Sequence, residues 1–430
     1  MLGANWIDGS WCEAAAGDAF EAGLRAAGSA ESVRWPRSSQ RDLARAIEAL
    51  ERGARGWRAL EAGQRRERLL RRLDRWQREA PGVDELCALL GLREGDLDAD
   101  LEAALDEGDR ALEEEHESAS GPSTEERGLH LLRADGAELW RGLVRELFPA
   151  LAAGRGALLL SDPSLPWVAR ELVRVLAEDE LLGGAVALLH DDRATCWSAG
   201  LACDAFERAY LPGVEPRADE GRAPVVAARP RPFGAGVLSE EDEEAAGIAA
   251  GPTQVELTPA RCSTFGVRED DAARAAAREV VERAFGPVRA LSGQRAGQVG
   301  RVVCHQRRFS EFTHALLERL DAGFDQEPCR PFGPGLARRV EDLCRLGLDE
   351  GATLLRGGPT EGAGFRGGRR KGILTPSVFT NAEPNMGLVL PRRPAPVLAL
   401  LRAESDAEVR TRIGEFEGDA PERRAASPPE

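Results

Sequence analysis

The strongest constraint on the fold is an alternation of strand-like and helix-like segments between residues 128 and 190. Three short apolar runs alternate with two longer segments whose apolar residues recur at helical spacing. The middle run, Ala157–Leu160, is continuously apolar, as strands buried in a parallel sheet are. This β–α–β–α–β order predicts a parallel sheet of the dinucleotide-binding type. In chain order the segments are GLHLLRA, AELWRGLVRELFPALAAG, GALLLS, PWVARELVRVLAEDELL and GAVALLH.

The glycine pattern that usually holds a dinucleotide is missing from this alternation. No GxGxxG motif stands between a predicted strand and the helix that follows it. The sequence therefore favours a Rossmann-type sheet but does not supply the usual phosphate cradle.

Helices precede this sheet. Apolar residues from Ser39 to Arg78 predict two amphipathic helices with a break near Gly63. Further helices are expected over Val83–Leu90 and Asp98–His116, and the polar segment ESASGPSTEERG connects them to the sheet. We expect residues 1–250 to form one domain that contains these helices and the Rossmann-like sheet.

A second α/β unit is expected from residue 251 to residue 413. It follows a Pro- and Arg-rich surface excursion over residues 214–235, and residues 414–430 are expected to be a polar, disordered tail. The predicted elements of the second unit are QVELT, DDAARAAAREVVERAF, GRVVCH, FSEFTHALLERL, GLARRVEDLCRLGLDEGA, TLLRGG and GILTPSVF.

Composition excludes several classes of function. The formal charge of −16 argues against a nucleic-acid partner. No apolar stretch reaches the roughly 18 residues of a membrane span, and the start MLGANWIDGSW does not resemble a signal peptide. The eight cysteines form no CxxC pair and the five histidines do not cluster with them, so we expect reduced cysteines, no metal and a cytoplasmic location.

One loop has the composition of a loop that presents a nucleophile. The segment LSGQRAGQVG, residues 291–300, combines small residues with two amides, Gln294 and Gln298. No Cys, Ser or Lys follows Gln294 at a position where a reactive atom would be needed, and the chain has a single lysine, Lys371. The loop therefore keeps the composition of an active-site loop but lacks a reactive group.

The order of these elements resembles the NAD(P)-dependent aldehyde dehydrogenase superfamily, from about Asn5 to about Ile413. The resemblance implies an α/β fold with a Rossmann-type domain followed by a second, catalytic-type α/β domain. Members of the family normally continue past this chain's last residues with a closing loop and an oligomerisation strand, which we expect to be missing here. The landmarks are NWIDGSW, AIEALERGARGW with RRERLLRRL, FPALAAGRGALLLSDPSLP, VELTP, SGQRAGQVGRVVCHQRRFSEF, EGATLLRGG, ILTPSVF and PNMGLVL.

The resemblance also implies which residues would carry catalysis. The family uses a cysteine thiolate as nucleophile, an amide to stabilise the oxyanion and a glutamate as base. The nucleophile position holds Ala296, or Gly300 in a rival register, and the oxyanion position holds Ala137. Only the base position is retained, as Glu256, although its two glycine neighbours are Thr258 and Pro259.

The positions that would bind NAD(P) are altered as well. The family's lysine near the ribose corresponds to Ser161, or to Asp162 if the loop is shifted by one. Its Gly-Ser turn corresponds to Pro212 and Gly213, and proline offers no N–H to a phosphate. The glutamate on the nicotinamide ribose is replaced by Arg392. We therefore expect no bound cofactor.

Two cysteines lie nearest to the altered loop in the predicted order of elements. Cys304 falls inside a predicted strand and Cys262 follows VELTPA. We interpret both as packing residues.

These substitutions favour a catalytically inactive, aldehyde dehydrogenase-like protein that serves as a structural or regulatory subunit. Its partner would be an active dehydrogenase or a second copy of itself. The alternative is an NAD(P)-dependent oxidoreductase with unconventional site residues. A third hypothesis, a decaying gene product, conflicts with the coherent apolar periodicity of the chain.

Overall fold

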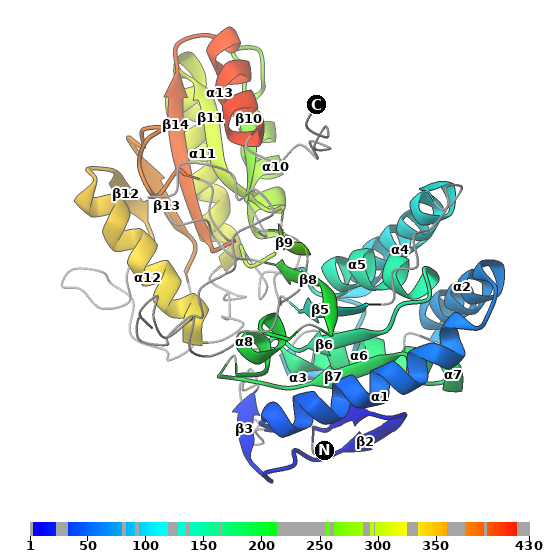
Figure 1. Cartoon of the computed structure of the whole chain (residues 1–430). Coiled ribbons are helices and arrows are strands. Elements are labelled where there is room, and N and C mark those ends of the chain that lie inside the picture. Colours follow the sequence, from blue (N-terminus) through cyan, green and yellow to red (C-terminus); the bar gives the residue numbers. More distant parts are fainter. Residues whose placement is uncertain are drawn as a thin grey trace, which may run out of the picture. The chain divides into compact units, whose positions relative to one another are not determined.

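The computed structural model describes most of the chain in two units, one extending to Thr258 and the other following it. Each unit has its own sheet and is described by itself (Figure 1). The described residues are 3–22, 33–79, 83–90, 94–118, 128–134, 138–163, 165–193, 195–203, 205–212, 254–258, 262–286, 293–295, 297–324, 334–358, 375–390 and 394–418.

The first unit is built on a seven-stranded sheet in the order β2-β1-β7-β6-β5-β8-β9. Strands β7, β6, β5, β8 and β9 run parallel, as the sequence predicts, while β1 joins β7 and β2 antiparallel. A separate two-stranded sheet joins β3 and β4. The strands are β1 (Asn5–Ile7), β2 (Ser10–Cys12), β3 (Ala19–Ala22), β4 (Val33–Pro36), β5 (Leu129–Arg133), β6 (Ala157–Leu160), β7 (Val186–Leu189), β8 (Phe206–Pro212) and β9 (Gln254–Thr258).

Eight helices of the described ranges belong to the first unit. Apolar residues of α1 and α8 pack with β5, β6 and β7 in one buried cluster, and α4 packs against α5. All four residues of β6 are buried, which confirms the prediction of a buried parallel strand. The helices are α1 (Gln40–Arg58), α2 (Ala62–Glu79), α3 (Val83–Leu90), α4 (Asp98–Ser118), α5 (Trp140–Ala152), α6 (Pro166–Leu176), α7 (Glu180–Gly184) and α8 (Thr195–Leu201).

Two helix boundaries differ from those predicted. The break between the first two helices precedes Ala62, so Gly63 lies inside the first turn of α2 and not at the break. The segment from Pro166 to Leu182 forms two helices instead of one. Asp179 caps α7 by accepting a hydrogen bond from the backbone N–H of Leu182 at 3.2 Å, which starts a new helix.

Close packing of α1 on α7 depends on glycine. A Cβ atom on Gly53 would lie 1.9 Å from the carbonyl oxygen of Gly184. Any side chain at residue 53 would therefore push the two helices apart.

The second unit has a five-stranded sheet in the order β10-β11-β14-β13-β12. Its strands are parallel except β12, which pairs antiparallel with β13. Strands β10 and β14 are not among the strands that the sequence predicts for this unit. The bounds are β10 (Ser263–Val267), β11 (Val299–His305), β12 (Thr353–Arg356), β13 (Ser377–Thr380) and β14 (Val397–Ala403).

Helices cover both faces of this sheet. Residues of α10 and α11 form one buried cluster with β11 and β14, and residues of α12 and α13 form another. Helix α13 runs through Gly418 and so enters the stretch that was expected as tail from residue 414, because Phe416 is buried in the second cluster. The helices are α10 (Ala273–Phe285), α11 (Gln306–Phe324), α12 (Pro334–Asp349) and α13 (Asp406–Gly418).

The predicted α/β fold, with a Rossmann-type sheet and a second α/β unit, is confirmed. The segment QVELT, which was expected as a strand of the second unit, is instead β9 of the first unit's sheet, where it pairs with β8, so the first unit reaches Thr258 and not residue 250. None of the helices in the described ranges has the length and apolar character that a membrane span needs.

Candidate functional site

The loop that the sequence singles out lies at the amino end of β11. Gly293 and Gly297 both have a left-handed backbone, with φ of 68° and 75°. A Cβ atom on Gly293 would lie 2.3 Å from the Cα atom of Pro396, just before β14. Gly293 is therefore required both by its dihedral angle and by its close approach to the neighbouring chain.

The Gln298 amide holds the loop in shape. Its Oε1 atom accepts a hydrogen bond from the backbone N–H of Arg295 at 3.0 Å. The loop is also joined to β10, since the Ser263 hydroxyl donates to the carbonyl of Gly297 at 2.8 Å and the Ser263 N–H donates to the carbonyl of Gln298 at 2.9 Å. The amide of Gln298 therefore orients the loop's own backbone.

The predicted nucleophile position, Ala296, lies outside the described residues, between two described parts of this loop. Gln294 is 2% exposed. The rival position, Gly300, is a buried residue within β11. A glycine in a buried strand has no side chain to offer a substrate.

Cys262 lies next to β10, the strand to which this loop is hydrogen-bonded. It directly precedes β10 and is 6% exposed. Its carbonyl oxygen accepts a hydrogen bond from Nη2 of the buried Arg301 at 2.9 Å. Cys262 is thus buried, as expected of a packing residue. It is also the neighbour in sequence of Ser263, whose hydroxyl is bonded to the loop.

Cys304 lies at the opposite end of β11 from the loop. Six residues of extended chain separate it from Gln298, a span of about 20 Å. Burial raises the pKa of the Cys304 thiol to about 12, and Arg402 acts in the opposite direction. The thiolate, which is the nucleophilic form, is therefore scarce at neutral pH.

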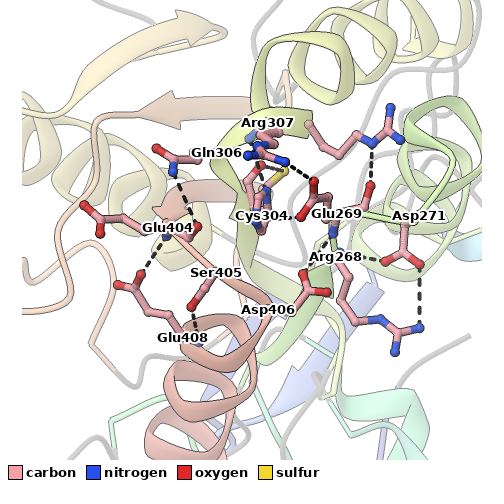
Figure 2. Close-up of polar contacts among 12 residues, drawn as sticks. Arg268, Glu269, Asp271, Cys304, Gln306, Arg307, Glu404, Ser405, Asp406 and Glu408 are labelled. Atoms are coloured by element: carbon pink, nitrogen blue, oxygen red, sulfur yellow. Dashed lines mark hydrogen bonds and ion pairs between the residues drawn. The ribbon is translucent and has the colours of Figure 1, made fainter.

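Figure 2 shows the surroundings of Cys304 at the carboxyl ends of β10, β11 and β14. The backbone N–H of Glu269 donates to Asp406 Oδ1 at 2.9 Å, and its carboxylate pairs with Arg307. On the other side of Cys304, the backbone N–H of Glu404 donates to Glu408 Oε2 at 2.6 Å. These contacts tie the strand ends to α11 and α13.

The retained base position, Glu256, is in the first unit. Its backbone lies in β9, in register with Tyr210 of β8. The Glu256 side chain lies outside the described part of the structure. Its role as a base therefore stays a prediction.

The predicted oxyanion position, Ala137, also lies outside the described residues, but the turn that follows it is described. Leu139 has a φ of 49° and a ψ of −126°, a strained conformation for a residue with a branched side chain. The Glu138 carboxylate lies over the first turn of α5, where a Cβ atom on Gly142 would be 1.9 Å from Glu138 Oε2. In the sequence, Glu138 directly follows Ala137, the position that the resemblance implies for an oxyanion-stabilising amide.

Arg145 connects this turn to β8. Its Nη2 atom donates to the Tyr210 hydroxyl at 2.5 Å and lies 3.5 Å from Glu138 Oε2. Burial acts to lower the pKa of Arg145, but Tyr210, Glu138 and Glu146 together raise it above its usual value. The guanidinium therefore stays charged and is surrounded by the chain's own groups.

The positions implied for NAD(P) are only partly described. Ser161 follows β6 and is 2% exposed, and its hydroxyl contacts His190 Nδ1 at 2.7 Å. The backbone of Pro212 pairs with Thr258 at the end of β8. Gly213 and Arg392 lie outside the described residues. Of the two alternatives for the lysine position, Ser161 is buried with its hydroxyl bonded to the protein, whereas Asp162 is half-buried.

Comparisons with known proteins identify the fold. Residues 257–413 match the Aldehyde dehydrogenase family. The solved structure of HpcC from Thermus thermophilus is 21% identical, covers 96% of this chain and 79% of its own, and gives a TM-score of 0.74. An aldehyde dehydrogenase from Bartonella henselae is 18% identical, with coverage of 96% and 85% and a TM-score of 0.72.

A third solved structure is a nucleotide complex. The NADP-dependent glyceraldehyde-3-phosphate dehydrogenase from Bacillus halodurans, complexed with NADP, is 16% identical, with coverage of 96% and 83% and a TM-score of 0.70. The chain therefore has the aldehyde dehydrogenase fold, as the sequence predicts. Identities this low establish the fold and leave the activity open.

Proposed function

We propose that this chain is a catalytically inactive, aldehyde dehydrogenase-like protein that serves as a structural or regulatory subunit of an active dehydrogenase. The observation that carries the proposal is the loop before β11. It keeps the glycines and amides that fix its shape, while the nucleophile position holds Ala296. A methyl group cannot form the covalent intermediate on which thiolate catalysis depends.

No described cysteine of the second unit compensates for this loss. Cys304 lies about 20 Å of strand away from the loop. Cys344 is fully buried in α12, where its thiol contacts the Ser377 hydroxyl at 3.5 Å. Cys262 is the remaining described thiol, and its burial argues for a packing role.

Stabilisation of the transition state is weakened independently. The oxyanion position holds Ala137, and losing one oxyanion donor typically costs about 100–1,000-fold in rate.

The subunit role is supported by the completeness of the scaffold. Both sheets have buried apolar clusters on their faces, and the helix contacts that depend on glycine are retained. Sequences that drift without constraint lose this agreement between local pattern and packing. We place the protein in the cytoplasm, with reduced cysteines, and take an active aldehyde dehydrogenase as its partner.

The subunit proposal is tested by affinity purification of the tagged full chain from its native host, followed by mass spectrometry. We expect an intact aldehyde dehydrogenase, with a cysteine at the loop position, in a fixed ratio to this chain. A second purification after washing in high salt separates stable assembly from charge-driven association. Recovery of the chain alone or as a homo-oligomer would contradict pairing with a dehydrogenase.

The loss of catalysis is tested by restoring the thiol. The Ala296→Cys variant should gain one thiol that reacts with iodoacetamide, yet oxidise no aldehyde, because the oxyanion and cofactor positions stay altered. Wild type and Ala296→Ser are the matched controls. Aldehyde oxidation by Ala296→Cys alone would contradict the loss of the other positions and restrict the defect to one residue.

A further inference from the structure

The fold implies an NAD(P) site at the carboxyl ends of the first unit's parallel strands, and the structure allows the fit to be tested there. In open α/β sheets, ligands bind in the crevice outside these strand ends. At β6 and β7 the first residues past the strands are Ser161 and His190. They are 2% and 0% exposed. Neither side chain faces a space that a ligand could enter.

His190 is bonded on both ring nitrogens. Nε2 lies 3.0 Å from the Ala4 carbonyl, which only accepts, so Nε2 carries the proton. Burial lowers the pKa of His190 to about 3, and the ring is therefore neutral with an accepting Nδ1. The Ser161 hydroxyl donates to that Nδ1 at 2.7 Å. The hydroxyl proton of Ser161 is therefore used in this internal hydrogen bond and is not available to a ligand.

The segment after β4 covers the end of β7. The Ser38 N–H donates to the His190 carbonyl at 2.8 Å, and the Ser38 hydroxyl donates to Asn5 Oδ1 at 3.0 Å. Asn5 Oδ1 also accepts from the His190 N–H at 3.2 Å. The strand end is therefore bonded to residues from the N-terminal part of the chain.

Two tryptophans, Trp35 and Trp167, pack against the carboxyl ends of β6 and β7. The Trp35 ring, 1% exposed, lies 4.6 Å from the His190 ring and meets Trp167 edge-on at 4.8 Å. Trp167 is in the first turn of α6, the helix that follows β6. Aromatic rings thus fill the space between the strand ends and α6.

The charges at this edge are unfavourable for a dinucleotide. Asp162, Asp191 and Asp192 follow β6 and β7 directly. Asp192 forms a two-pronged pair with Arg37 at 2.7 and 2.8 Å, and Asp191 accepts from the Cys196 N–H at 2.6 Å at the start of α8. Arg37 is therefore committed to Asp192, and a pyrophosphate could not recruit it without breaking this pair.

We propose that residues of the chain's own N-terminal part, Ala4, Asn5, Trp35 and Ser38, occupy the carboxyl edge of β6 and β7 in place of a dinucleotide, so that the first unit binds neither NAD nor NADP. The residues present at this edge do not fit NAD or NADP. This inference rests on the first unit alone, whereas the proposed loss of catalysis rests on the loop of the second.

Calorimetric titration and thermal unfolding of the full chain test the inference, with NAD and with NADP up to about 1 mM. We expect no heat of binding and no rise in Tm. A nucleotide that did bind, at 100 times its Kd, would raise the free energy of unfolding by about 2.7 kcal/mol and would be detected. A saturable heat with either nucleotide would overturn the inference. Nucleotide binding without aldehyde oxidation would leave the proposed inactivity standing, so the two proposals fail separately.

A pair of variants tests whether the edge is held by internal bonds. Ser161→Ala should lower the Tm by several degrees, because it leaves His190 Nδ1 buried without a donor. Ser10→Ala is the control: Ser10 is exposed, its hydroxyl donates to the Ile7 carbonyl, and its loss should change the Tm little. An unchanged Tm in Ser161→Ala would overturn the role of this contact, even if no nucleotide binds.

Discussion

The loop before β11 and the strand ends of β6 and β7 differ in how they depart from a dehydrogenase. The described part of the loop is held by two left-handed glycines, by the hydrogen bond between Arg295 and Gln298, and by its bonds to β10. The position where the resemblance implies a nucleophile holds Ala296. The strand ends are instead filled, with His190, Ser161 and Trp35 buried against one another. At the loop, the proposal is that one reactive group is absent. At the strand ends, the proposal is that the chain's own side chains occupy the space of a ligand.

The two regions differ in whether a single substitution could restore the residue or space that a dehydrogenase site needs. A side chain can be added to a loop that keeps its geometry, so a thiol can be returned to residue 296. A filled edge cannot be emptied by one substitution, because each member of the network is packed and bonded to others. If the proposed function holds, a cysteine returned to residue 296 would therefore not be enough for catalysis.

The largest expected effect concerns the retained geometry of the loop. Gly293→Ala should destabilise the second unit by about 3 kcal/mol or more, because a Cβ atom meets Pro396 backbone in a left-handed conformation. Gly297→Ala is the matched control, since Gly297 has a similar φ with nothing within 4 Å of its Cβ position, and should cost about 1 kcal/mol. Denaturant unfolding measures both. Equal costs would mean that the loop does not press on Pro396.

The next effect concerns the filled edge and is a pH dependence. Burial lowers the pKa of His190 and of His130 to about 3, from 6.5. The unfolded chain therefore binds more protons than the folded one between these values, so stability is full above about pH 6.5 and falls as the pH drops toward 3. Each histidine should remove up to about 1.4 kcal/mol per pH unit.

Denaturant unfolding of the wild type and of His190→Gln, between about pH 7 and pH 5, measures this slope. The variant should have a shallower slope because one of the two histidines with a lowered pKa is gone. The exposed His314, replaced by Gln, is the control and should leave the slope unchanged. If His190→Gln keeps the wild-type slope, His190 is not held neutral at the strand ends.

The smallest expected effect is on thiol reactivity. Cys304 should react with a maleimide only as fast as the second unit unfolds, because its thiol is buried in β11 and its pKa is raised to about 12. Labelling with and without denaturant, read by peptide mass spectrometry, gives the rate at each cysteine. Half-buried Cys12 and Cys203 serve as internal references. Fast native labelling of Cys304 would contradict its packing role.

The sequence predicts much of the scaffold because periodicity reports burial directly. The apolar run of β6 and the amphipathic helix over Val83–Leu90 are found as predicted. Boundaries set by a side-chain bond are harder to predict, as at Asp179, whose cap divides one expected helix into α6 and α7. The short strands β1 to β4 carry too few residues to show a period.

Ala296 and Ala137 are assigned from the order of motifs alone, and because both lie outside the described residues these assignments stay predictions. The contact between Ser161 and His190 joins residues 29 apart on two strands, and Trp35 reaches them from a third segment. Nothing in the local sequence marks such a meeting, so the inward turn of Ser161 required the structure.

The central claim is that the dehydrogenase framework persists without its chemistry, and a turnover assay tests it most directly. Purified full chain at high concentration is mixed with NAD or NADP and a panel of short, long and aromatic aldehydes, and NAD(P)H absorbance is followed. The account predicts no rate above that of buffer, for the wild type and for Cys262→Ala alike. A saturable rate in the wild type that Cys262→Ala abolishes would contradict it and identify Cys262 as the nucleophile of an unconventional oxidoreductase.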